Sequence, residues 1–219
     1  MFAKEGFYIV IPSFIVNTFV IILFNYLFNN WFPLFGWFFS PLFILTAFFT
    51  FFFRNPPRTP EGDGILAPTD GTIMSIKSEG NKLEMFIELA ASDVHTQRAP
   101  SDGKILSVER IKGSHHPIYF INKGEINSEY IVPANKNARI NIEMIDSDGL
   151  PMKIILIAGI FARRCKAYVK PGVEVKRGQN IGIIMFGSLL KFELVGKFKI
   201  IKKVGDHVKA GKHVILKKV

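Results

Sequence analysis

A Gly-Ser pair interrupts an apolar run close to the C-terminus. The stretch IIMFGSLLKFE, residues 183–193, has the composition of a buried β-strand. Gly187 weakens a strand because it brings no side chain to pack, and Ser188 places a hydroxyl where an apolar residue is expected. The pair therefore indicates either a bulge in an ordinary sheet or a peptide bond that is placed to react.

A short polar segment, DVHTQRAP at residues 93–100, contains side chains suited to acid-base chemistry. It brings Asp93, His95 and Arg98 close together in the sequence. Histidine is the side chain best suited to proton transfer near neutral pH, but a histidine in a polar loop is also commonly just solvated. Both interpretations of His95 stay open on the residues alone.

Asp70, in the segment PTDG, has two interpretations as well. Aspartate before glycine is favoured in turns for local reasons, because its side chain bonds to nearby backbone. The segment recurs as PSDG around Asp102, which supports a structural turn for at least one of the two aspartates. Spacing alone favours a structural role for both.

The sequence gives little support for a metal site, a phosphate-binding loop, a hydrolase-type serine or a reactive cysteine. The five histidines show no metal-binding spacing, and there is neither a P-loop nor a G-x-S-x-G element. We expect no metal. The single cysteine, Cys165, excludes an internal disulfide and is expected to be a plain buried thiol.

The N-terminal part of the chain is apolar enough for a membrane. No charged residue lies between Gly6 and Phe53, and residues 7–29 and 31–53 each approach the length of about 20 residues that a spanning helix needs. We expect a helical hairpin over residues 1–53. The flanking Lys4 and Arg54 predict that both of its ends lie in the cytoplasm. An interfacial or re-entrant element is the alternative.

The rest of the chain is predicted to be a linker, residues 54–64, and a β domain, residues 65–219. Short runs rich in Val, Ile and Phe alternate with turn residues, and two segments repeat: APTDGTIMSI as APSDGKILSV, and VKPGVEVKRGQNI as KKVGDHVKAGKHV. These repeats resemble those of biotinyl and lipoyl carriers without the modifiable lysine. We expect a mostly β, barrel-sandwich or lipoyl-like fold with duplicated hammerhead elements.

The formal net charge of +10 suits an anionic surface. The adjacent apolar segment favours acidic lipid over nucleic acid as that surface.

Five ordered motifs, FFRNPPR, APTDG, DVHTQRAP, IAGIFARR and IIMFGS, together resemble the short, membrane-associated form of phosphatidylserine decarboxylase. The resemblance runs from about residue 51 to the C-terminus. It implies that the protein cuts its own Gly187–Ser188 bond, giving a β chain, 1–187, and an α chain, 188–219. Ser188 then becomes a pyruvoyl group, the covalent cofactor.

The same resemblance implies the reaction and its setting. The pyruvoyl ketone forms a Schiff base with the amine of phosphatidylserine, carbon dioxide leaves, and phosphatidylethanolamine is released. The implied partners are the substrate lipid, an anionic membrane and the paired α and β chains. The implied location is the cell membrane, with the catalytic domain on the cytoplasmic side.

Individual roles carry over unevenly. Asp70 matches the aspartate of the family's P-x-D-G element, and His95 matches the first histidine of a D-x-H-x-x-H stretch, which makes it the candidate proton donor. Arg98 stands where that stretch has its second histidine. Because arginine cannot act as a general base at ordinary pH, either His95 serves both steps or self-cleavage relies on strain and hydrogen bonding. Arg98 is a candidate for binding the substrate phosphate or carboxylate.

Two other functions compete with the enzyme. A membrane-anchored adaptor with a lipoyl-like domain would explain the hairpin and the repeats without chemistry, although no heptad run for its usual coiled coil is present. A related scaffold that folds but never matures is the third hypothesis.

Overall fold

The computed structural model describes residues 2–27, 32–116, 135–159, 164–185 and 188–219. The chain divides into two compact units, Met1–Pro57 and Arg58–Val219. The first unit is helical and the second is built from strands, so the expectation of a mostly β protein with an N-terminal apolar helical segment is confirmed. The lipoyl-like detail stays a prediction.

The helical unit consists of α1 (Lys4–Leu27) and α2 (Phe32–Phe52). Polar contacts join them: Asn17 Nδ2 donates to Thr46 Oγ1 at 2.8 Å, and the hydroxyls of Ser13 and Thr46 lie 2.5 Å apart. Among the described residues, the stretch Lys4–Phe24 is long and apolar enough to cross a membrane, and Leu42–Phe52 is shorter. These features favour membrane association, and spanning by two helices stays a prediction.

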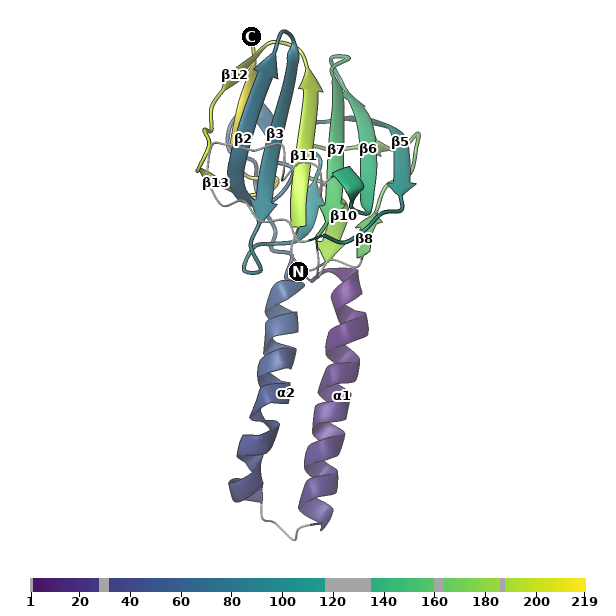
Figure 1. The fold of residues 1–219 in the computed structure, drawn as a ribbon, viewed down its shortest axis with the longest axis vertical. Coiled ribbons are helices and arrows are strands. Elements are labelled where there is room, and N and C mark those ends of the chain that lie inside the picture. The colour runs from purple at the N-terminus through teal and green to yellow at the C-terminus, as the bar shows by residue number, and fades with distance from the viewer. Residues whose placement is uncertain (1, 28–31, 117–134, 160–163, 186–187) are drawn as a thin grey trace. The chain divides into compact units, whose positions relative to one another are not determined.

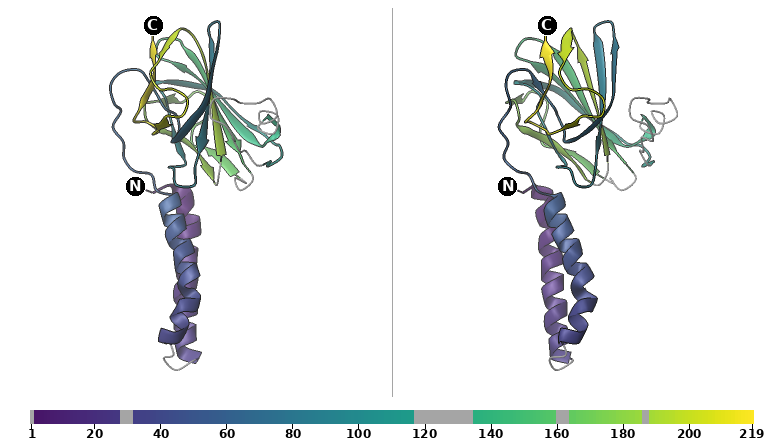
Figure 2. Two further views of the ribbon diagram at one scale, coloured as in Figure 1. Left: turned by 60° about the vertical axis from the view of Figure 1, so that its left-hand side comes forward. Right: turned by 90° about the vertical axis from the view of Figure 1, so that its left-hand side faces the viewer.

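The described residues of the β unit form three sheets. The largest has eight strands in the order β13-β2-β3-β11-β7-β6-β5-β9, and Figure 1 shows its central strands side by side. Its strands are β2 (Gly71–Glu79), β3 (Lys82–Leu89), β5 (Gly103–Ile111), β6 (Arg139–Asp146), β7 (Pro151–Ala158), β9 (Glu174–Val175), β11 (Ser188–Val195) and β13 (His207–Val208). The two views in Figure 2 show that this sheet is strongly twisted, as wide antiparallel sheets normally are.

Two smaller sheets complete the β unit. One has the order β4-β10-β8 and the other β1-β14-β12. Their strands are β1 (Ile65–Leu66), β4 (Thr96–Arg98), β8 (Arg164–Ala167), β10 (Asn180–Met185), β12 (Phe198–Ile200) and β14 (Val214–Lys218).

The core of the β unit follows from strand alternation. In β11, Leu190, Phe192 and Leu194 are buried in the main hydrophobic cluster, while Leu189 belongs to a second, smaller cluster. The expectation of one strand over residues 183–193 is wrong, because the stretch is divided between the end of β10 and the start of β11, which belong to different sheets. The position of β11 between β3 and β7 fixes it from both sides.

The sequence repeats occupy matching places in the large sheet. β13 pairs with the start of β2, with Val208 opposite Gly71, and β9 pairs with the start of β5, with Val175 opposite Gly103. A Cβ on Gly71 would meet the Glu88 carbonyl oxygen at 2.2 Å, so this close approach requires glycine. The duplication therefore produces two equivalent turn-and-strand units.

Candidate active site

The expected cleavage site lies between two described strands. β10 ends at Met185 and β11 begins at Ser188; Gly187 lies outside the described residues, and of Ser188 only the backbone is described. Ser188 is paired with Leu89 of β3 and Ala158 of β7. The backbone of Ser188 therefore starts a strand that is held on both sides.

The segment between β3 and β4 brings His95 to this place. It begins directly after Leu89, the partner of Ser188, and ends at His95, whose carbonyl oxygen accepts a hydrogen bond of 3.1 Å from the Ile184 amide. The Ala90 amide donates to Asp93 Oδ2 at 2.9 Å, which closes a local turn within the segment. Pairing at both ends places the segment alongside the β10–β11 junction.

His95 belongs to a cluster with Asp93 and His207. Its ring is buried, and Nδ1 lies 2.9 Å from the Asp93 carbonyl oxygen, which can only accept a hydrogen bond. In the neutral ring, Nδ1 therefore carries the proton, and Nε2 is the nitrogen able to accept one. The Asp93 carboxylate in turn bonds His207 Nε2 at 2.8 Å. Asp93 thus connects the two histidines.

Asp70 lies in an ionic cluster at the start of β2. It is 3% exposed and receives both Nη atoms of Arg58, with Nη2 at 2.6 Å from Oδ2. The Ala210 amide donates to Asp70 Oδ1 at 2.7 Å, and Arg58 Nη1 donates to the Ala210 carbonyl oxygen at 3.0 Å. Both carboxylate oxygens are therefore engaged, which suits a positioning role more than proton transfer.

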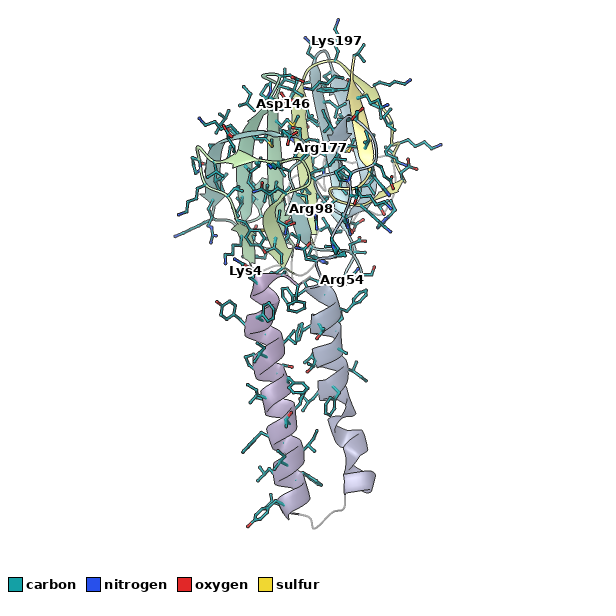
Figure 3. All side chains as sticks on the ribbon, turned by 180° about the vertical axis from the view of Figure 1, so that it is seen from behind. Lys4, Arg54, Arg98, Asp146, Arg177 and Lys197 are labelled. Atoms are coloured by element: carbon teal, nitrogen blue, oxygen red, sulfur yellow. The ribbon has the colours of Figure 1, made fainter. Side chains whose placement is uncertain are left out.

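Arg98 lies close to this ionic cluster. Its side chain is buried and Nη1 donates to the Gly178 carbonyl oxygen at 3.2 Å. Burial lowers the pKa of Arg98, the charge of Arg58 lowers it further, and Asp70 opposes both. Figure 3, seen from behind, shows Arg98 among the strands of the β unit. Arg98 still carries its charge at neutral pH and supplies no general base.

The site residues expected from the sequence thus lie in two groups. His95 is hydrogen-bonded to Ile184 near the end of β10, while Asp70 and Arg98 lie together in the ionic cluster. Two segments connect the groups. His95 directly precedes β4, and β4 ends with Arg98. Residues 207–210 supply both His207, which bonds Asp93, and the Ala210 amide, which bonds Asp70.

Two functional candidates were missed by the residue-level interpretation. Arg58 lies in a proline-rich linker where no periodicity marks it, although it ends the FFRNPPR motif. His207 falls in a repeat whose pattern is explained by turns. Contacts to Asp70 and Asp93, both distant in sequence, are what single them out.

Cys165 is confirmed as a buried thiol. Burial raises its pKa to about 12, with a smaller opposing effect from Arg110, so it is not a nucleophile at neutral pH. Within the described part of the chain, no three His, Cys, Asp or Glu residues gather in a way that could hold a metal ion.

Comparisons with known proteins identify the family to which the chain is similar. Residues 45–216 match the family model described as phosphatidylserine decarboxylase. A putative archaetidylserine decarboxylase proenzyme of Archaeoglobus fulgidus is 38% identical over 178 residues, covering 81% of this chain and 83% of the relative. A phosphatidylserine decarboxylase proenzyme of Pelobacter propionicus is 32% identical, covering 81% and 80%. Another, of Carboxydothermus hydrogenoformans, is 31% identical, covering 97% and 94%.

The family match extends over most of the chain and includes both clusters and the Gly187–Ser188 junction. It confirms the resemblance seen in the sequence motifs and the expected class of enzyme, a decarboxylase. This chain belongs to the phosphatidylserine decarboxylase family.

Proposed function

We propose that the chain is a proenzyme that cuts itself at Gly187–Ser188 and then decarboxylates phosphatidylserine to phosphatidylethanolamine and carbon dioxide. The observation that carries the proposal is the placement of Ser188 at the start of a strand paired on both sides, next to the segment that ends in buried His95. The word proenzyme in the relatives' names supports self-processing.

Self-cleavage is a rearrangement at one peptide bond. The Ser188 hydroxyl attacks the carbonyl carbon of Gly187 and converts the amide into an ester. The Cα proton of residue 188 is then removed and its Cβ–O bond breaks, which releases residues 1–187 with a carboxylate end and leaves dehydroalanine at residue 188. The nitrogen of residue 188 leaves as ammonia after hydrolysis, and residues 188–219 begin with a pyruvoyl group.

The structure around Ser188 suits such a terminal group. Since β11 pairs with β3 through Val195 and with β7 through Leu194, the new chain end stays within the sheet after the cut. When present, the ketone supplies an electron sink for decarboxylation, the task that pyridoxal phosphate performs in other enzymes.

His95 is the proposed proton carrier in both stages. Its Nδ1 is held by the Asp93 carbonyl oxygen, so Nε2 is the nitrogen that takes a proton during self-cleavage and delivers one to the substrate carbon after carbon dioxide leaves. This choice resolves the problem set by Arg98, which cannot act as a base. We assign Asp70 a positioning role, because Arg58 and Ala210 engage both of its oxygens.

The lipid substrate is expected to arrive from a membrane. We propose that the helical unit holds the enzyme at the cell membrane, with the β unit on the cytoplasmic side, and that the basic chain favours anionic lipid. The names of the relatives include both phosphatidylserine and archaetidylserine, which share the serine headgroup. The family membership favours this enzyme over the membrane-anchored adaptor.

Intact-mass spectrometry tests the proposal directly. The purified 24.8 kDa chain is expected to appear as two fragments that end and begin at residues 187 and 188, and the mass of the smaller is expected to show a pyruvoyl group in place of an N-terminal serine. Ser188→Ala should abolish both the cut and decarboxylation. A Ser188→Ala protein that still decarboxylates phosphatidylserine would disprove the mechanism. His95→Gln is expected to lose both the cut and decarboxylation while keeping the fold.

A further inference from the structure

A basic cavity lies beside the residue that pairs with Ser188. It has a volume of about 330 Å³ and lies where β5, β6, β7 and β8 come together. Its described lining residues include four groups that carry or can carry positive charge and none that is acidic. The lining residues are Arg110, Ile111, Lys112, Gly113, His115, Ala138, Arg139, Ile140, Ala158 and Cys165.

Strand pairing places this cavity close to the reaction centre. Ala158 is the partner of Ser188, and the Ala158 amide donates to the Ala138 carbonyl oxygen at 2.9 Å. Neighbouring strands are about 4.8 Å apart, so Ala158 and Ala138 lie roughly 5 and 10 Å from the backbone of residue 188. The cavity floor therefore begins one strand away from the proposed site of chemistry.

The charges of the cavity are available to a ligand. Arg110 and Lys112 are exposed, and in the described part of the chain neither forms an ion pair. Arg110 makes one long contact, 3.5 Å from Nη2 to the Cys165 carbonyl oxygen. Arg139 Nη1 already donates to the Asn135 and Asn137 carbonyl oxygens. Arg139 therefore contributes positive charge to the cavity, but this nitrogen is not a free hydrogen-bond donor.

We infer that this cavity binds the phosphodiester of the substrate headgroup, with Arg110 and Lys112 as its ligands. The inference rests on the proposed function, because it takes the reacting amine to be at residue 188. In a serine phosphodiester only two carbons and one oxygen separate the amine nitrogen from phosphorus. The phosphate must therefore lie near residue 188, and a cavity lined by arginine and lysine on an apolar floor fits it.

The ionic cluster fits the phosphate less well. Both Nη atoms of Arg58 bond Asp70, and Arg98 is only 8% exposed with a bond to Gly178. A phosphate entering there would have to displace the buried carboxylate. Arg110, on β5, and Lys112, just after it, are exposed and can bind an anion without displacing a carboxylate. Arg98 is thereby assigned to the ionic cluster and not to the phosphate.

The test compares two double variants of the full-length enzyme in detergent micelles. Arg110→Gln/Lys112→Gln removes the two exposed charges proposed to bind the phosphate, and Lys77→Gln/Lys104→Gln removes two exposed charges elsewhere on the large sheet. Intact mass must first show that both variants cut themselves fully. The cavity variant is expected to raise KM for phosphatidylserine about tenfold with kcat little changed, as loss of charge-assisted hydrogen bonds predicts, while the control variant keeps the wild-type KM.

Two further arms distinguish the source of the phosphate. With an acyl ester of serine that lacks phosphate, wild type and the cavity variant should have equal KM. Inorganic phosphate should inhibit wild type competitively and the cavity variant more weakly. An unchanged KM for phosphatidylserine in the cavity variant would overturn the inference, even if inhibition by free phosphate were lost. Failure of the wild type to cut itself would instead refute the proposed function.

Discussion

Two copies of one turn-and-strand unit are built alike and differ in their surroundings. The first copy consists of residues 67–76 and 202–214, and the second of residues 99–108 and 169–181. In the first, the Ala210 amide donates to Asp70 Oδ1 at 2.7 Å. In the second, the Arg177 amide donates to Asp102 Oδ1 at 2.9 Å. The aspartate before glycine therefore has the same backbone task in both copies.

The difference lies in burial and charge. Asp70 is buried and paired with Arg58, whereas Asp102 is exposed. His207 of the first copy bonds Asp93, and the equivalent position of the second copy is the exposed Glu174. The two copies have the same turn-and-strand frame, and among the described residues the first copy alone carries the aspartate and histidine that contact Arg58 and Asp93. This comparison predicts that matched substitutions have unequal effects.

The largest difference is expected between Asp70→Asn and Asp102→Asn. Removing one partner of a buried ion pair leaves Arg58 with an uncompensated charge, which costs about 3–5 kcal/mol. Asp102→Asn keeps an oxygen for the Arg177 amide and should cost under about 0.5 kcal/mol. Denaturant unfolding of the uncut Ser188→Ala protein measures both. Equal losses would show that the two aspartates are equivalent after all.

The next difference is expected at the matching turn glycines. Gly211 and Gly178 have φ of +66° and +83°, so alanine at either position costs about 1 kcal/mol or more. A Cβ on Gly211 would also meet Arg98 Cδ at 2.5 Å, whereas the nearest atom for Gly178 is 3.7 Å away. Gly211→Ala should therefore lower the free energy of unfolding by about 1–2 kcal/mol more than Gly178→Ala does, in the same unfolding measurement. The reverse order would contradict the position of Arg98.

A third pair, His207→Ala and Glu174→Ala, tests the histidine cluster. Loss of the bond to Asp93 loosens the segment that holds His95, so kcat should fall about tenfold with KM unchanged. Glu174→Ala should leave kcat as it is. His207→Gln, which can still donate to Asp93, should recover most of the activity. A fall in KM or in folding alone, with kcat intact, would argue against a positioning role.

The smallest effect is expected from Glu88, which pairs with Thr72 in the first copy; the matching place in the second copy holds Ile145. Burial raises the pKa of Glu88 above its ordinary value of 4.5. The wild type therefore loses stability as pH rises through the raised pKa, because the native state must then carry a poorly solvated charge. Glu88→Gln should be more stable at neutral pH by under about 1 kcal/mol, reduced by solvent screening, and equal at pH 3.

Much of the fold followed from local pattern. Alternating apolar runs and Gly-centred turns predicted a β protein, and the repeats predicted its duplication because each copy carries its own turn chemistry. The apolar N-terminal segment predicted the helices. The lipoyl-like detail is not confirmed, since sequence periodicity reports which residues are buried but not the order of strands in a sheet of eight.

The site was predictable only in part. Motifs pointed to His95, Asp70 and the Gly187–Ser188 bond, and the family match supports that resemblance. They could not show that Asp70 meets Arg58 or that Asp93 joins His95 to His207, because those contacts depend on tertiary packing of distant segments. The cavity around Arg110 was likewise invisible, since its lining comes from strands far apart in the chain.

The pairing of β11 on both sides affects how the protein can refold before and after the proposed cut. Before the proposed scission, β11 is tethered to the rest of the β unit, so it finds β3 and β7 at a high effective concentration. Afterwards the same strand belongs to a separate polypeptide, and renaturation becomes a bimolecular search that dilution slows. We therefore expect the denatured precursor to refold more readily than the two separated mature chains, so the mature protein would depend on slow dissociation for its persistence.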